Sequence, residues 1–127
     1  MREPGTCLVV IAVIGTPAPR LAAALDRFAA RGVHLAREPD ERLPARFRLA
    51  WIFVDEAALA GPEVRAWHAR LAALAPVQLA VRAPPARHEA LALSCIDLKD
   101  GAILQPYDDA SFGQVSRLIE AFLARAD

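Results

Sequence analysis

Short apolar runs separated by amphipathic stretches repeat along the chain. Residues 8–14 and 49–54 are continuously apolar, and the run 77–81 is interrupted only by Gln78. Parallel strands that are covered on both faces have this composition because neither face meets water. Two shorter runs, 33–36 and 102–104, complete a set of five predicted strands.

The stretches between these runs predict helices. After the first run, Thr16 is a suitable N-cap with Pro17 at the first helical position, and Gly32 ends the periodic stretch. A further helix is expected over residues 62–75, and a short one over about 87–94. Each helix therefore connects two predicted strands.

Two further segments complete the pattern of elements. Residues 39–47 lie where a doubly wound fold places its second helix, but Pro44 permits only a turn or so of helix there. We therefore expect a shortened or irregular element. Residues 111–126 have apolar positions at spacings of three and four, which predicts a final helix capped by Asp108 or Asp109.

Strands and helices alternate over the 127 residues with short connections and no internal repeat. This order predicts a single α/β domain spanning residues 1–127. Its expected architecture is a doubly wound five-stranded parallel sheet with a shortened second helix. The apolar fraction of 55% is large enough to fill a core on both faces of such a sheet.

Composition argues against several classes of function. The formal net charge is zero, so no bulk electrostatic argument favours binding to nucleic acid or to a membrane. Cys7 and Cys95 have neither metal-ligand nor CxxC spacing, which indicates reduced thiols in a cytoplasmic protein. The apolar run 8–14 is too short to span a bilayer. We therefore expect a cytoplasmic protein.

Polar side chains occur where the predicted strands end. Asp55 and Glu56 follow the third strand, Arg82 follows the fourth and Gln105 follows the fifth. Open parallel sheets bind ligands at the carboxyl ends of their strands. These four residues are therefore the candidate site, and Arg82 is a candidate ion-pair partner for Asp55.

The pattern Gly101-x-Ile103-x-Gln105-Pro106-x-Asp108, followed by an amphipathic helix, adds a family resemblance. It resembles the last strand and helix of response-regulator receiver domains, which have a flavodoxin-like fold. It is most similar to the degenerate receivers at the front of ANTAR-type antitermination regulators. The likeness covers nearly the whole chain.

The resemblance implies a receiver that has lost its chemistry. Asp55 matches the phosphoacceptor of the family, but Gln105 replaces the lysine that contacts the phosphoryl group, and Arg82 replaces a hydroxyl residue. The acidic pair that holds magnesium is missing from residues 13–16. The implied protein is a pseudo-receiver with no catalysis, no cofactor and no metal. The family also implies a cis peptide bond before Pro106.

Such regulators respond to a partner protein, and we expect a partner surface or homodimer contact around Tyr107, Phe112 and Phe122 on the last strand and helix. An ANTAR protein continues into an RNA-binding helical bundle, whereas this sequence ends at Asp127, so we expect either a stand-alone domain or one whose output part was removed. RNA binding therefore does not carry over to this chain. The alternative is a TIR-like NAD hydrolase or another small flavodoxin-like ligand-binding domain. A TIR-like enzyme would need Glu63 or Glu56 as its catalytic glutamate. A receiver with an unusual metal site would need carboxylates that the pattern does not supply.

Overall fold

The computed structural model describes residues 8–38, 41–59, 61–93 and 103–126. Its elements follow in the order β1 (Val9–Val13), α1 (Pro19–Ala30), β2 (His34–Ala36), β3 (Leu49–Asp55), α2 (Pro62–Ala72), β4 (Val77–Arg82), α3 (His88–Leu93), β5 (Ile103–Tyr107) and α4 (Phe112–Ala126). Short 3-10 turns, η1 (Glu56–Ala58) and η2 (Pro85–Arg87), follow β3 and β4. The predicted alternation of strands and helices is confirmed.

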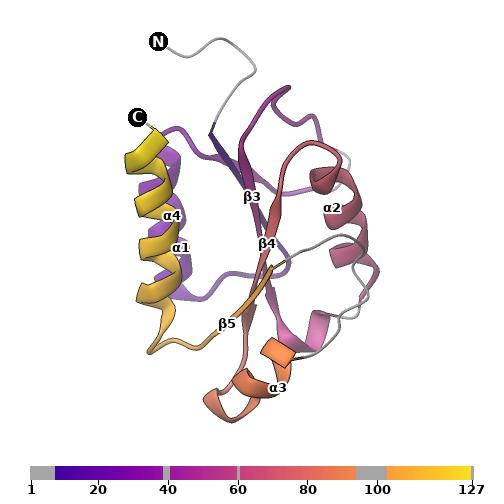
Figure 1. Cartoon of the computed structure of the whole chain (residues 1–127), viewed down its shortest axis with the longest axis vertical. Helices are drawn as coiled ribbons and strands as arrows, with labels where there is room; N and C mark the ends of the chain where they lie inside the picture. Colours follow the sequence, from indigo (N-terminus) through magenta and orange to yellow (C-terminus); the bar gives the residue numbers. More distant parts are fainter. Residues whose placement is uncertain (1–7, 39–40, 60, 94–102, 127) are drawn as a thin grey trace.

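All five strands pair in parallel in the order β2-β1-β3-β4-β5. The chain leaves β1 toward β2 and then returns to the other side of β1 to form β3. The point where the strand order reverses therefore lies between β1 and β3. Helices cover both faces of the sheet, with α1 and α4 on one side and α2 on the other (Figure 1). The predicted flavodoxin-like, doubly wound fold is confirmed.

Each face of the sheet has its own core, because successive side chains of a strand point in opposite directions. Trp51 and Phe53 of β3 pack with α1 and α4, where Phe28 and Ile119 are almost fully buried. The intervening residue Ile52 packs on the opposite face with α2. Burial on both faces explains why β3 is apolar throughout and does not alternate with polar residues.

The first helix begins later than predicted. It starts at Pro19, and its N-cap is Ala18, which makes no side-chain capping hydrogen bond. The prediction of Thr16 as the cap with Pro17 at the first position was wrong. A proline restrains the residue before it to extended backbone, and Ala18 accordingly has φ −63° and ψ 156°. The end was predicted correctly, since Gly32 has φ 90° just beyond the helix.

The connection between β2 and β3 contains no helix among its described residues, 37–38 and 41–48. This segment, which we call the strap, carries Pro44 and inserts Phe47 into the core next to α2. The expected shortened second element is thus an irregular strap. Pro44 disfavours a helix within the segment, and Phe47 and the partly buried Leu43 pack on the core from irregular backbone.

The last strand is longer than predicted, because it continues through Pro106 to Tyr107. A turn then leads into α4. The Asp108 carboxylate accepts hydrogen bonds from the backbone N–H (2.8 Å) and the hydroxyl (2.7 Å) of Ser111, and Ser111 Oγ accepts from the Asp108 N–H (3.0 Å). Because α4 begins at Phe112, the residue at its N-cap position is Ser111, and the prediction of Asp108 or Asp109 there was wrong; Asp108 instead holds the turn before the helix. None of the described helices combines the length and apolarity needed to cross a membrane.

Candidate functional site

The candidate site lies at the carboxyl end of the sheet. Asp55, Arg82 and Tyr107 are direct register partners at the ends of β3, β4 and β5. Strand alternation places Asp55 on the same face as Phe53, toward α1 and α4. The three side chains line a hollow of about 20 Å³, which is room for roughly one water molecule.

Arg82 is paired with Asp109 rather than with Asp55. Its Nε and Nη2 atoms donate to the two carboxylate oxygens of Asp109 at 3.2 Å and 3.1 Å. This hydrogen bonding and the charge of Asp109 raise the pKa of Arg82, and the Asp55 charge adds a smaller contribution in the same direction. Arg20 of α1 also contacts this turn, because its Nη1 donates a hydrogen bond to the Asp109 carbonyl at 2.8 Å. The predicted pairing of Arg82 with Asp55 is therefore corrected to Asp109.

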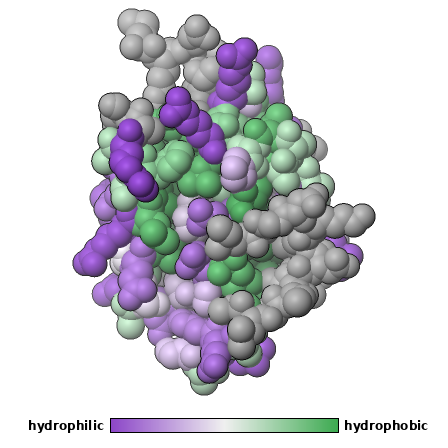
Figure 2. All heavy atoms as spheres, viewed as in Figure 1, coloured by the Kyte–Doolittle hydropathy of each residue, from purple (hydrophilic) through white to green (hydrophobic). Residues whose placement is uncertain are grey.

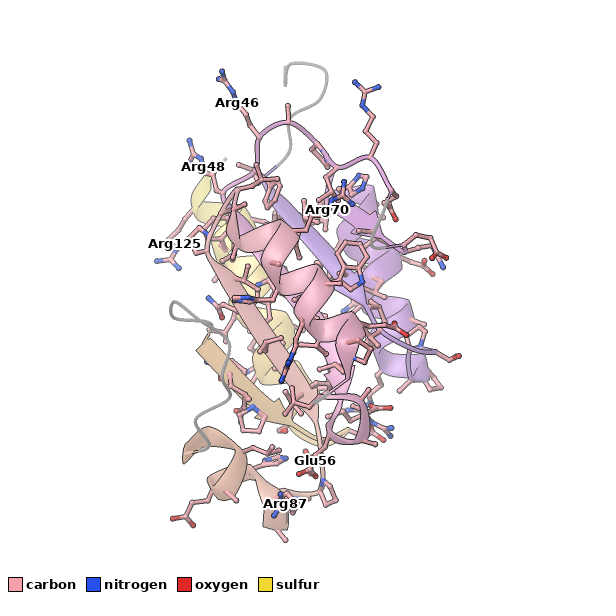
Figure 3. All side chains as sticks on the ribbon, turned by 90° about the vertical axis from the view of Figure 1, so that its right-hand side faces the viewer. Arg46, Arg48, Glu56, Arg70, Arg87 and Arg125 are labelled. Atoms are coloured by element: carbon pink, nitrogen blue, oxygen red, sulfur yellow. The ribbon has the colours of Figure 1, made fainter. Side chains whose placement is uncertain are left out.

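Glu56 points away from this row. It begins η1, and its carboxylate accepts two hydrogen bonds from Arg87, at 2.9 Å and 2.7 Å. The pair links the end of β3 to the start of α3 (Figure 3). Charge and hydrogen bonding from Glu56 raise the pKa of Arg87. Glu56 therefore has a structural role in tying two loops together.

Gln105 lies two residues before Tyr107 in β5, further from the carboxyl end of the sheet. Its register partner is Ala80, two residues before Arg82, and its side chain is partly buried. The structure therefore does not bring Gln105 to the edge with Asp55 and Arg82. The peptide bond before Pro106 is trans, so the expected cis bond was wrong. Pro106 pairs with Val81, and a trans bond lets β5 continue as an extended strand to Tyr107.

Tyr107 and Phe112 are part of the core and not of a partner surface. They are 4% and 6% exposed, and their rings pack with centroids 5.8 Å apart. Tyr107 also meets Phe53 edge-on at 6.1 Å. The predicted surface role is therefore wrong for both residues, because the end of β5 turns inward against α4. Phe122 is half-buried against the same core cluster.

Burial raises the pKa of Tyr107 from 10.0 to about 12. The negative charges of Asp55 and Asp109 act in the same direction, because a phenolate beside a carboxylate is repelled. The charge of Arg82 opposes the shift. The phenol thus stays protonated at neutral pH and contributes a neutral wall to the site.

The loop after β1 supplies no carboxylate to this edge. Ile14, Gly15, Thr16 and Pro17 occupy it, and Gly15 makes the turn with φ 85°. Within the described ranges, no three His, Cys, Asp or Glu side chains converge as a metal site would require. A magnesium ion needs several oxygen ligands, and Asp55 has no second carboxylate beside it from β1.

Two larger hollows flank the row. One of about 430 Å³ is lined by Asp55, Glu56, Arg82 and Asp109, among others. Arg82 pairs with Asp109 and Arg87 pairs with Glu56, so two of these carboxylates are already engaged. The other hollow, of about 600 Å³, lies beside β1 and β2 and includes Glu63.

Four labelled arginines lie toward the opposite end of the sheet: Arg46, Arg48, Arg70 and Arg125 (Figure 3). Arg70 and Arg125 occupy the last turns of α2 and α4. Cations in that position are stabilised by the helix dipole, which is a structural role. Figure 2 shows apolar residues in the middle of this face, with hydrophilic residues above and below them and along the left edge.

Sequence reasoning missed Asp109 as a member of the site. Asp109 was considered only as a helix cap, yet it lies just beyond the fifth strand, where the same rule that selected Asp55 and Arg82 applies. It also missed Glu41, whose carboxylate holds the corner after β2. No sequence pattern marks Glu41, because its contacts depend on how the strap folds back.

We compared the chain with protein-family models, curated proteins and solved structures, and found no match in any of the three. The function of this protein therefore has to be inferred from its fold and its side chains.

Proposed function

We propose that this protein is a pseudo-receiver, a cytoplasmic and non-enzymatic signalling module of the response-regulator or antitermination type. It acts through protein contact and without phosphorylation. The observation that supports this most directly is the carboxyl end of the sheet. Asp55 has the position of a phosphoacceptor there, but an Arg82–Asp109 ion pair stands beside it. The strand order supports the proposal too, because receivers share it.

The chemistry of phosphoryl transfer explains why the site is inactive in this proposal. Transfer to a carboxylate requires a cation that neutralises the charge on the phosphoryl oxygens. The loop after β1 offers no ligand for such a cation, and the guanidinium of Arg82 already has Asp109 as its partner. An incoming phosphoryl group would also face the carboxylates of the neighbouring hollow. Each of these features disfavours an aspartyl phosphate at Asp55.

The contact surface in this proposal is the outward face of α4. Leu118 is 48% exposed, which is unusual for a large apolar side chain on this protein. Phe122, one helical turn further on, is half-buried beside it. Apolar side chains at this spacing on a helix fit a protein partner. The partner is either a second copy of the chain or a sensor protein.

An amide NMR titration tests the loss of phosphoryl chemistry. Magnesium is added first, and beryllofluoride, which mimics an aspartyl phosphate, is added second. We expect no saturable shifts at Asp55, Arg82 or Tyr107. A receiver that is known to be phosphorylated serves as the positive control. Saturable shifts centred on Asp55, or covalent addition of a phosphoryl group from acetyl phosphate, would refute the proposal.

A second experiment tests the contact surface. Leu118→Glu places a charge on the outward face of α4, whereas Leu74→Glu changes the other large exposed apolar residue, which is 50% exposed at the end of α2. Sedimentation equilibrium compares both variants with the wild type. We expect Leu118→Glu alone to abolish self-association or binding to a partner purified from the host. Equal effects of the two variants would contradict a role specific to α4.

A ligand-binding or TIR-like enzyme is the second candidate function. The observation that favours it is the placement of Glu63, which lines the hollow of about 600 Å³ at the carboxyl end of β1 and β2. A catalytic glutamate would need such a placement. Incubation of the purified chain with NAD distinguishes this candidate, with Glu63→Gln as the control. Hydrolysis by the wild type that is lost in the variant would favour the enzyme over the pseudo-receiver.

A further inference from the structure

A hollow lies at the carboxyl ends of β1 and β2, next to the strand at which the order reverses. Its volume is about 600 Å³, within the range of sites that hold small molecules. Val13 of β1, Leu35 of β2 and Leu25 of α1 supply its apolar side. Open α/β sheets bind ligands at the carboxyl ends of their strands, near such a reversal, and this hollow lies at the carboxyl ends of β1 and β2.

The described part of the strap packs on one face of the sheet. It is irregular, and Phe47 lies with α2 on the opposite face from Leu35. On the α1 side, the hollow is bounded by Leu25 and Leu35, and Arg37 and Glu38 at the start of the strap also line it.

The rim of the hollow is held in place by Glu41. Its carboxylate accepts hydrogen bonds from the backbone N–H groups of Arg37 and Glu38, and the second of these measures 2.8 Å. His34 Nε2 lies 3.3 Å from the same carboxylate. Burial opposes ionisation of Glu41, but these hydrogen bonds outweigh it and hold its pKa below the usual value. These hydrogen bonds hold the backbone of Arg37 and Glu38, and therefore the position of both residues at the rim.

The charges at this rim select a class of ligand. Glu38 and Glu63 contribute two carboxylates, and Arg37 contributes one guanidinium. Glu41 is already engaged by its hydrogen bonds, so the described lining residues carry an excess of one negative charge beside the apolar side of the hollow. A ligand that complements it has an apolar body and a single positive charge. Phosphate-rich ligands such as dinucleotides meet repulsion at the same rim.

We propose that this hollow binds a small monocationic amphipathic ligand, such as an alkyl or arylalkyl amine. The apolar body lies against Val13, Leu25 and Leu35, and the ammonium group lies at Glu38 and Glu63. The site is separate from the Asp55–Arg82 row, so the inference does not depend on the loss of phosphorylation. In a pseudo-receiver, such a site would give the module a chemical input in addition to its protein partner.

A matched series of three probes tests the ligand class: hexylamine, hexanol and hexanoate. They share one alkyl chain and differ in charge, so their affinities separate the apolar and the electrostatic parts of binding. The readout is an amide NMR titration of the full chain. We expect hexylamine to shift Gly15, Leu35 and Ala36 saturably, hexanol to bind more weakly and hexanoate most weakly. No saturable shifts at these residues with any probe would overturn the proposal, as would hexanoate binding as tightly as hexylamine.

One substitution and a matched control test the role of the rim. Glu63→Gln removes a carboxylate at an exposed position in the first turn of α2. We expect it to weaken hexylamine about threefold, the range of a solvent-exposed ion pair, and to leave hexanol unchanged. Glu89→Gln removes an exposed carboxylate from α3, outside the hollows described above, and should change neither. Equal weakening of hexylamine by both variants, or none by Glu63→Gln, would overturn the assignment.

Discussion

The phenol of Tyr107 provides a direct test of how the carboxyl end of the sheet is packed. Tyr107 is the only tyrosine of the chain, so the absorbance of its phenolate reports one group alone. The side chain is 4% exposed, and burial together with the charge of Asp55 raises its pKa to about 12. We expect a native titration midpoint near that value and a midpoint of about 10 in denaturant.

The same shift predicts how stability depends on pH. Between about pH 10 and 12 the unfolded chain has lost the phenolic proton while the folded chain retains it. The unfolded state then binds fewer protons, so the free energy of unfolding falls as pH rises through this window. The contribution is complete below about pH 10. A shift of two pKa units corresponds to roughly 2–3 kcal/mol, an upper value because partial access of water reduces it.

Three variants identify the source of the shift. Asp55→Asn removes a neighbouring negative charge and should lower the midpoint of Tyr107, whereas Arg82→Gln removes a positive charge and should raise it. Glu89→Gln on α3 should leave it unchanged. Chemical denaturation of Tyr107→Phe should lose the fall in stability over this pH window. A native midpoint near 10 in the wild type would refute the reasoning, because it would place the phenol in water.

Further predictions concern stability. Ile119→Ala removes a fully buried side chain and should lower the free energy of unfolding by about 2–5 kcal/mol, whereas Leu118→Ala at the preceding, exposed position should change it by no more than about 0.5 kcal/mol. Trp51→Phe should cost less than about 1 kcal/mol, because the buried indole N–H has no hydrogen-bond partner in the described structure and its removal offsets lost packing. Glu41→Gln should destabilise the protein above about pH 4.5, the usual pKa of this group, and the difference from wild type should shrink as pH falls through the lowered pKa. Urea denaturation measures the free energy of unfolding for all of these variants. A loss above about 3 kcal/mol for Trp51→Phe would contradict the second prediction. Equal costs for Leu118→Ala and Ile119→Ala would contradict the first, and a pH-independent effect of Glu41→Gln would contradict the third.

The Arg82–Asp109 pair also bears on the proposed pseudo-receiver function. Both side chains are substantially exposed, at 42% and 62%, so the pair is a weak stabilising element. The pair instead fixes the position of the turn after β5, because it joins this turn to the end of β4. Asp55 is left with the Arg82 charge nearby but without a cation site. That arrangement is the basis of our proposal that the protein does not depend on phosphorylation of Asp55.

The order and burial of the elements could be predicted from the sequence alone. A strand buried on both faces, such as β3, must be apolar throughout, and an amphipathic helix such as α4 must repeat its apolar residues every three or four positions. These are local requirements that the chain displays in its own residues. The position of Asp55 at a strand end followed from the same pattern, as did Gly32 beyond the first helix.

Contacts between distant segments were decided only by the tertiary structure. Arg82 and Asp109 are 27 residues apart, and their pairing depends on the register of β5 and on the turn after it. The sequence predicted Tyr107 as a surface aromatic. In the structure it is the last residue of β5, beyond Pro106, and its ring is buried in the core. The hollow beside β2 likewise brings together residues of β1, α1, β2 and α2 that are distant in the sequence. The local sequence pattern indicates which side chains are buried, but the strand register and the paths of the loops decide which side chains contact one another.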